Sequence, residues 1–220
     1  MQVRLSRAEY WLLEIVVDSR CPLSLVNAST HKDAEGIEQM FDKPGHGLNR
    51  DELIDVLTQL AGQGWIEGSR DGRPIRLDGQ TIISALTEPP PSRNSSCTCY
   101  QLTEEGGKVW EAFAAPDWSQ LVREELDDDT QAGTLTGMVS GRVEKYLRYL
   151  GMVQCQLDLQ SIQVEEIGPW EATYWKMLPH GHRARFHWWH QWERSGLPYE
   201  FSDLAFSGFC EFRDRWYRWQ

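Results

Sequence analysis

The chain has 220 residues, of which 40% are apolar and 25% are charged, and its formal net charge is -11. This composition is that of an ordinary globular protein that can bury a core without disulfides or metal. Nucleic-acid binding without sequence preference depends on Lys and Arg that neutralise phosphates, so an acidic chain could bind DNA only through a local basic patch.

The cysteines and the apolar residues are distributed as in a protein of the cytoplasm. Five cysteines, an odd number, argue against a disulfide framework and favour a reducing compartment. We find no long apolar run and no charged-then-apolar start, so we expect neither a membrane span nor a signal peptide. A cytoplasmic location is therefore predicted.

The chain opens with a helix signal. Ser6 and Glu9 have the spacing of a capping box, in which each side chain accepts a hydrogen bond from the other residue's backbone N–H. The residues that follow are apolar on nearly all sides, which predicts a buried helix that ends near Ser19. A further short helix is predicted over residues 34–41.

A second helix signal is stronger. Asn49 and Glu52 form another capping box, and the residues behind it carry an apolar stripe at helical spacing. Gly64 stands where a left-handed glycine commonly ends a helix, and residues 65–67 are predicted to be a strand.

The segment after this strand is predicted to turn back on itself. A turn rich in Gly and Pro lies at residues 69–74, and the returning strand is expected to end at Leu102. Thr103 then caps a helix to about residue 115. Between the turn and the returning strand lies a long insertion, residues 75–98, which contains a proline-rich loop.

Residues 6–115 resemble the winged helix-turn-helix domain of MarR-type and PadR-type regulators. The resemblance rests on the order of capped helix, strand, turn, strand and helix, and on the phrase Tyr-Gln-Leu-Thr-Glu-Glu-Gly at residues 100–106. It implies that residues 50–63 are the recognition helix, that residues 69–76 are the wing, and that the helix after Thr103 serves in dimerisation.

The charged residues of the predicted recognition helix bear on whether such a domain binds DNA or a protein. The exposed start of the recognition helix carries several carboxylates, which phosphate repels, whereas DNA-reading helices present basic and amide side chains. If the domain binds DNA, the candidate contacts are the available arginines, Arg50, Arg70, Arg73, Arg76 and Arg93. We favour the other use, in which the winged helix contacts a protein partner or a second copy, and duplex DNA is disfavoured by charge.

The second half is predicted to be a separate domain. The acidic stretch of residues 124–133 favours a solvated connector. The predicted domains are a winged-helix-like domain at 1–118, a short helix with an acidic linker at 119–135, and an aromatic-rich domain at 136–220. Helices are expected at 138–150 and 203–219, and strands at 155–159, 170–178 and 183–189. The whole chain is therefore assigned to the α+β class, with a small antiparallel sheet flanked by helices after the winged helix.

Two groups of side chains are candidates for metal or redox chemistry. Histidines are dense between residues 180 and 190, and His180 and His182 are the residues that would hold a metal. Strand alternation, however, puts His182 and His187 on opposite faces, and we predict no metal and no other cofactor. Cys97 and Cys99 are two close thiols that could oxidise or capture a soft metal ion.

The C-terminal segment is unusually aromatic, since seven of the eleven Trp residues lie from residue 170 onward. Trp, Tyr, Phe and Arg carry much of the energy of protein interfaces. On the final predicted helix, the candidate partner-binding residues share spacings of three and four: Phe209, Arg213, Trp216 and Trp219. The alternative is that these residues form the core of the second domain.

We find no Ser-His-Asp order, nucleophile elbow, phosphate-binding glycine loop or dinucleotide fingerprint, so an enzyme is not predicted. The favoured hypothesis is a non-catalytic winged-helix protein that acts through protein contacts, by analogy a bacterial regulatory or immunity-type factor. The alternative is a DNA-binding transcriptional regulator that uses the wing arginines, with the C-terminal half as sensor or dimerisation domain. A third hypothesis is a hydrolase or metal enzyme built on the His-rich hairpin.

Overall fold

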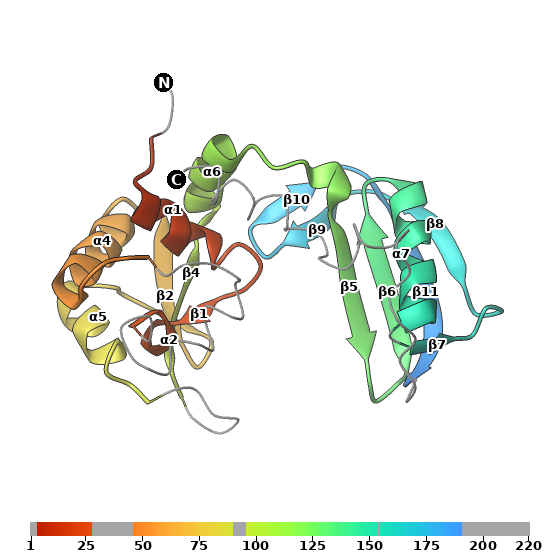
Figure 1. The fold of residues 1–220 in the computed structure, drawn as a ribbon, viewed down its shortest axis with the longest axis horizontal. Helices are drawn as coiled ribbons and strands as arrows, with labels where there is room; N and C mark the ends of the chain where they lie inside the picture. Colours follow the sequence, from red (N-terminus) through yellow and green to blue (C-terminus); the bar gives the residue numbers. More distant parts are fainter. Residues whose placement is uncertain (1–3, 28–45, 90–95, 154, 191–220) are drawn as a thin grey trace. The chain divides into compact units, whose positions relative to one another are not determined.

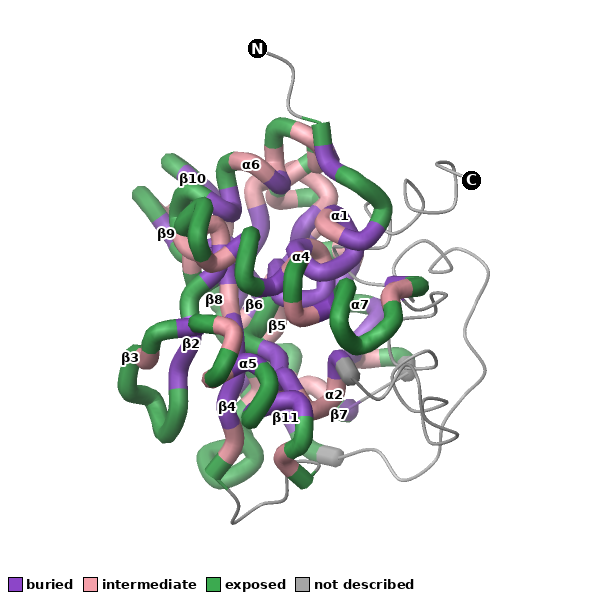
Figure 2. The backbone as a smooth tube through the Cα atoms, turned by 90° about the vertical axis from the view of Figure 1, so that its left-hand side faces the viewer, coloured by how far each residue is buried: buried purple, intermediate pink, exposed green. Residues whose placement is uncertain are grey.

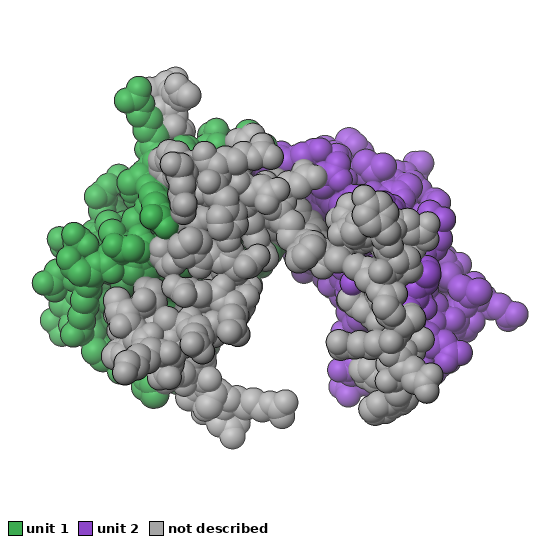
Figure 3. All heavy atoms as spheres, viewed as in Figure 1, with its two compact units in different colours: residues 1–115, 173–175 green, residues 116–172, 176–220 purple. Residues whose placement is uncertain are grey.

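The computed structural model describes residues 4–27, 46–89, 96–153 and 155–190. The chain divides into two compact units (Figure 3). Unit 1 is Met1–Ala115 with Thr173–Trp175, and unit 2 is Pro116–Ala172 with Lys176–Gln220. Both units combine helices with antiparallel sheets, which agrees with the α+β class predicted from the sequence (Figure 1).

Unit 1 packs helices around an antiparallel sheet. Its described elements are, in chain order, α1 (Arg7–Glu14), β1 (Cys21–Pro22), α2 (Leu23–Asn27), α4 (Arg50–Gly62), β2 (Ile66–Arg70), β3 (Arg73–Ile75), α5 (Gly79–Ala85), β4 (Thr98–Leu102) and α6 (Glu104–Ala114). Within the described residues the strand order is β1-β4-β2-β3, and each neighbouring pair is antiparallel. The first and the last strands of the unit, β1 and β4, are therefore direct neighbours.

Both predicted capping boxes are present. The Glu9 amide donates to Ser6 Oγ over 3.2 Å, and the Ser6 amide donates to Glu9 Oε2 over 2.7 Å. Asn49 and Glu52 make the same pair of bonds at the start of α4. Gly64 has the expected positive φ of 72°, so the sequence predicted the ends of α4 correctly.

The core of unit 1 is formed by helices α1, α2, α4 and α5 and by strands β2 and β4, whose buried residues are purple in Figure 2. Tyr10, Trp11 and the two following leucines are almost fully buried, and the Tyr100 hydroxyl from β4 donates to the Leu12 carbonyl over 2.9 Å. Because that hydroxyl has a partner, the Tyr100 ring can be buried without the cost of an orphaned polar group.

Two side chains of unit 1 come from far along the chain. The Leu102 amide donates to the Tyr174 hydroxyl over 2.7 Å, and that hydroxyl donates to the Val16 carbonyl over 2.6 Å. Trp175 Nε1 donates to the Val17 carbonyl over 3.0 Å, across a sequence separation of 158 residues. Residues 173–175 therefore complete unit 1, although the strands on either side of them belong to the second half of the chain.

Trp175 explains a glycine in α6. The indole packs edge-on against Trp110, with ring centroids 6.1 Å apart. A Cβ at Gly107 would meet the Trp175 ring, so only glycine leaves room for this contact. The same argument holds at Gly106, where a Cβ would meet the Trp65 carbonyl.

Unit 2 contains a sheet with a helix on one face. Its described elements are the 3-10 helix η2 (Trp118–Gln120), β5 (Val122–Asp127), β6 (Ala132–Gly137), α7 (Ser140–Val153), β7 (Cys155–Leu157), β8 (Gln163–Ile167), β9 (Trp170–Thr173), β10 (Lys176–Leu178) and β11 (Gly181–His190). Among the strands that the structure describes, β5, β6 and β11 pair in that order, while β7 and β8 both pair with the other edge of β11. Strands β9 and β10 form a separate pair.

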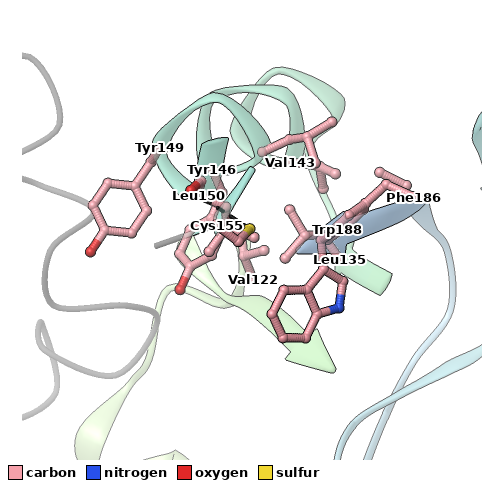
Figure 4. Close-up of a cluster of buried hydrophobic side chains, with 11 residues drawn as sticks. Val122, Leu135, Val143, Tyr146, Tyr149, Leu150, Cys155, Phe186 and Trp188 are labelled. Atoms are coloured by element: carbon pink, nitrogen blue, oxygen red, sulfur yellow. Dashed lines mark hydrogen bonds between the residues drawn. The ribbon is translucent and has the colours of Figure 1, made fainter. Parts of the chain in front are cut away.

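The core of this unit lies between α7 and the sheet (Figure 4). Strand β11 alternates strictly, with Ala184, Phe186 and Trp188 buried and the residues between them more exposed. Leu135 from β6 and Val143 and Leu150 from α7 close the same cluster. A strand with this alternation has one face on a core and one face free of it.

Of the short helix and acidic linker predicted at 119–135, the short helix is present as η2, but the linker is wrong. Strands β5 and β6 form a hairpin there, and Asp127 accepts hydrogen bonds from the amides of Asp129 and Thr130 in its turn. Glu124 points to the α7 side with Val122 and Leu126, while Glu125 lies on the exposed side. The placing of Val122 and Leu126 at even spacing within this run of charges was the feature of the sequence that indicated a strand.

Two smaller differences concern the second half. The predicted strand at 170–178 is two strands, β9 and β10. Helix α7 begins at Ser140 and runs past Gly151, whose missing Cβ lets Leu157 approach to 3.0 Å of that position. The helices predicted at 34–41 and 203–219 lie outside the described residues.

The packing around Trp175 predicts opposite effects for two helical glycines. Gly107→Ala should lower the free energy of unfolding by about 1–3 kcal/mol, because the added methyl overpacks the Trp175 contact. Gly62→Ala should raise it by about 0.5 kcal/mol, because nothing lies within 4 Å of its Cβ position and alanine restricts the unfolded chain. Urea denaturation followed by tryptophan fluorescence measures both. Destabilisation of the same size in both variants would contradict the contact.

Candidate functional site

Helix α4 presents an acidic face. Leu53, Leu57 and Leu60 are buried against the unit, whereas Asp51 and Asp55 are exposed. Glu52 is also exposed, but its carboxylate accepts the Asn49 amide hydrogen bond over 2.9 Å and serves the helix cap. Carboxylates in the first turn of a helix interact favourably with its dipole, so Asp51 and Glu52 also stabilise α4 itself.

The β2–β3 hairpin brings two of the predicted arginines together. Arg70 and Arg73 are direct partners across the hairpin, and Asp71 and Gly72 form its tip with φ of 52° and 73°. This is the backbone that a tight two-residue hairpin requires. Arg73 is exposed, and Arg76, one residue beyond β3, is exposed as well.

Arg70 is held by groups within unit 1. Its Nη1 lies 3.2 Å from Glu88 Oε1, and its Nε donates to Ser96 Oγ over 3.1 Å. Ser96 Oγ in turn donates to Asp71 Oδ2 over 2.9 Å. A ligand that used Arg70 would have to compete with these partners.

Glu88 is the centre of this network, and sequence reasoning missed it. Only 14% of its side chain is exposed. Its two carboxylate oxygens accept the amide of Thr98 over 2.7 Å and the Thr98 hydroxyl over 2.9 Å, in addition to the Arg70 ion pair. Glu88 therefore ties the segment after α5 to β4 and to the hairpin. No local motif marks it, because its partners lie ten and eighteen residues away.

The five arginines predicted to contact DNA thus differ in their position in the fold and in the charges around them. Arg70 and Arg73 share the hairpin, with Arg76 just beyond it. Arg50 is exposed at the start of α4, on the helix that also carries Asp51 and Asp55. Arg93 lies outside the described residues, as do the predicted partner-binding residues Phe209, Arg213, Trp216 and Trp219.

The histidines do not converge. His180 precedes β11 and is exposed, and its backbone carbonyl accepts the Trp170 Nε1 hydrogen bond over 2.9 Å. His182 lies on the α7 side of β11 and His187 on the opposite side, as strand alternation predicts. Within the part of the chain that the structure describes, no three His, Cys, Asp or Glu side chains form a group that could hold a metal ion.

Two thiols of unit 1 are in contact. Cys97 Sγ lies 3.6 Å from Cys99 Sγ, at the start of β4. Cys99 is buried and Cys97 is half-buried. The two thiols that are close in sequence are therefore also in contact in the folded protein.

A half-buried carboxylate lies beside the core of unit 2. Glu124 accepts the Tyr146 hydroxyl over 2.8 Å. Burial raises the pKa of Glu124, and the Tyr146 hydrogen bond opposes that rise. Burial also raises the pKa of the Cys155 thiol, to about 11, with a smaller contribution from the Glu124 charge. A carboxylate in such a position is either a functional group or a cost to stability that the hydrogen bond reduces.

The sheet face of unit 2 that points away from α7 is polar and aromatic. It carries Arg185, His187 and Trp189, and 42% of Trp189 is exposed. Arg185 Nη2 pairs with Glu165 Oε1 over 2.9 Å, so part of the positive charge is neutralised on the surface itself.

Comparison with family models, with curated proteins and with solved structures finds no match for this chain. None of the helices described is long and apolar enough to cross a membrane. The geometry of the two units is therefore the basis for the function proposed below.

The buried position of Glu124 predicts a pH dependence. Since its pKa is raised in the folded protein, folding favours the protonated form. The contribution of Glu124 to the free energy of unfolding is fully present below the ordinary pKa of glutamate and is lost as pH rises through the raised value. Glu124→Gln should remove this slope and stabilise unit 2 at neutral pH. Thermal unfolding measures this effect at pH values from about 4, near the ordinary pKa of glutamate, to about 8.

A control lies on the next residue of the same strand. Glu125 is exposed and pairs with Arg123 over 2.9 Å, and exposed ion pairs contribute little. Glu125→Gln should leave the difference in melting temperature between acid and neutral pH unchanged. An equal change in both variants would show that the net charge of the strand, and not the burial of Glu124, sets the slope.

Proposed function

We propose that this protein is a non-catalytic factor that acts through protein–protein contacts, and that unit 1 is a winged helix used as an interaction domain. A bacterial regulatory or immunity-type role suits its acidity by analogy. The observation that carries the proposal is the exposed face of α4, where Asp51 and Asp55 stand at the positions with which a recognition helix would approach phosphate.

The order of elements in unit 1 supports the winged-helix part of the proposal. Helices α1, α2 and α4 are followed by the β2–β3 hairpin, and β4 returns between β1 and β2. Helices of a helix-turn-helix followed by a hairpin as the wing would have this order, and strand β3 is then an addition to the sheet of β1, β4 and β2. The helix α5 and the Glu88 segment are then an insertion in the wing.

The electrostatics of unit 1 favour a protein partner. DNA binding draws most of its free energy from cations that neutralise phosphates. On α4 two exposed aspartates accompany Arg50, and the ion pair with Glu88 occupies Arg70. The partner expected for the α4 face therefore has a basic surface.

One observation favours the alternative, a DNA-binding transcriptional regulator with unit 2 as sensor or dimerisation domain. Arg70 and Arg73 lie opposite each other at the tip of the hairpin, and Arg76 is exposed just beyond it. Arginines at a wing tip can contact backbone phosphates or enter a minor groove. The two uses make opposite predictions for binding to duplex DNA.

Fluorescence anisotropy with a mixed-sequence duplex separates them. At about 50 mM and then about 200 mM salt, we expect no binding tighter than ~100 μM, which is the weak end of the nonspecific range. The triple variant Arg70→Ala, Arg73→Ala and Arg76→Ala should behave as the unmodified chain does. Micromolar binding that weakens steeply with salt and is lost in the triple variant would overturn the proposal and establish the regulator.

The α4 face predicts which residues a partner needs. In chemical cross-linking of the native protein in its own cell extract, the double variant Asp51→Asn, Asp55→Asn should lose a cross-linked protein that the unmodified chain captures. Loss of favourable charge at the helix start costs only about 0.3–1 kcal/mol, so the variant should remain folded.

Asp129→Asn is the matched control, because Asp129 is exposed in the β5–β6 turn of unit 2. It should leave the cross-linked protein unchanged. A capture that survives in the double variant, or that fails equally in the control, would show that the α4 face is not the contact surface.

A further inference from the structure

Three cysteines of unit 1 lie on neighbouring strands. Cys21 is in β1 and Cys99 is in β4, and the residue after Cys21, Pro22, is the direct partner of Cys99 across the two strands. Cys97 immediately precedes β4, with its sulfur 3.6 Å from that of Cys99. All three are free thiols.

The three thiols differ in their access to solvent. Cys97 is half-buried, while Cys99 and Cys21 are 8% and 6% exposed. A small oxidant from solution therefore reaches Cys97 first. A thiol in sulfur–sulfur contact with a second, shielded thiol has the arrangement of an attacking and a resolving cysteine.

We propose that Cys97 and Cys99 form an oxidation site, at which a hydroperoxide converts the two thiols to an intramolecular disulfide. Cys97 reacts first and Cys99 resolves. This inference does not depend on the partner proposed above.

The reaction balances with one equivalent of peroxide. The Cys97 thiolate attacks one peroxide oxygen, the O–O bond breaks, and the second oxygen leaves as water or alcohol after taking up a proton. Cys97 is then a sulfenic acid. The Cys99 sulfur attacks the Cys97 sulfur, the S–O bond breaks, and that oxygen leaves as water with the Cys99 proton. Two thiols are oxidised and one peroxide is reduced.

The pKa of Cys99 bears on the second step. Burial, the hydrogen bond with Cys97 and the charge of Cys97 together raise the pKa of Cys99 to about 12. A neutral sulfenic acid at Cys97 no longer carries that charge. The Cys99 proton is therefore released more readily after the first step than before it, although burial, the largest cause of the raised pKa, remains. The sulfur–sulfur contact of 3.6 Å is the feature that favours disulfide formation.

The disulfide would act on the hydrogen bonds and the ion pair that join Thr98, Glu88 and Arg70, here called the wing network. Residues two apart in a strand are separated by about 6.6 Å, close to the upper limit for the Cα atoms of a disulfide. Closing the bond therefore bends the chain at Thr98, which lies between the two cysteines. Thr98 donates both hydrogen bonds to Glu88, and Glu88 holds Arg70. Oxidation thus loosens the contacts that hold Arg70.

The test uses the reduced full chain, hydrogen peroxide at about one equivalent, and dimedone as a trap for sulfenic acid. After alkylation of the remaining thiols, mass spectrometry of the peptide with Cys97 and Cys99 should show the loss of two hydrogens and little dimedone. Cys99→Ser should raise the dimedone adduct at Cys97 by about tenfold, because nothing resolves it. Cys97→Ser should give no adduct at the buried Cys99.

Cys155→Ser is the matched control, since Cys155 is a buried thiol of unit 2. It should give the products of the unmodified chain. Equal dimedone adducts in the unmodified chain and in Cys99→Ser, or a disulfide that includes Cys21, would overturn the proposal. The disulfide in the unmodified chain is mapped without any variant, so a variant that fails to fold does not prevent the test.

Hydrogen exchange tests the link to the wing network. The Thr98 amide should exchange about tenfold faster in the oxidised than in the reduced protein, because its bond to Glu88 is weakened. The Val143 amide, in α7 of unit 2, should not change. Unchanged exchange at Thr98 with the disulfide present would overturn the coupling to Arg70.

Discussion

Unit 1 depends on two aromatic side chains that the chain supplies from far downstream. The Tyr174 hydroxyl connects the last amide of β4 to the Val16 carbonyl, and Trp175 Nε1 satisfies the Val17 carbonyl. Carbonyls just after a helix have no partner within that helix, so a buried helix end needs donors from elsewhere. The same indole fills the space that Gly107 leaves in α6.

The sequence predicted what is determined locally. The capping boxes at Ser6 and Asn49 and the positive φ of Gly64 depend on neighbours within a few residues, and all were predicted correctly. The phrase that ends in Gly106 was noticed for its resemblance, yet the physical reason for this glycine lies in its contact with Trp65, and that for the next one, Gly107, lies in its contact with Trp175. Such partners cannot be inferred from spacing.

The candidate site shows the same limit. Arginines at the hairpin tip were predicted from a Gly- and Pro-rich turn and from the winged-helix resemblance, and Arg70 and Arg73 do lie together. What composition could not show is that Glu88 neutralises one of them from an insertion without a motif. In the second half, the carboxylates of β5 were mistaken for a connector, because their charge was weighed before their alternation with Val122 and Leu126.

The discontinuity of unit 1 has a consequence for protein synthesis. Its core includes residues 173–175, and the chain is made from the N-terminus. When residue 115 has left the ribosome, every helix and strand of the unit has been synthesised, but the Val16 and Val17 carbonyls still lack their donors. The nascent unit must therefore wait, incompletely packed and with apolar surface open to chaperones, until about four-fifths of the chain has emerged.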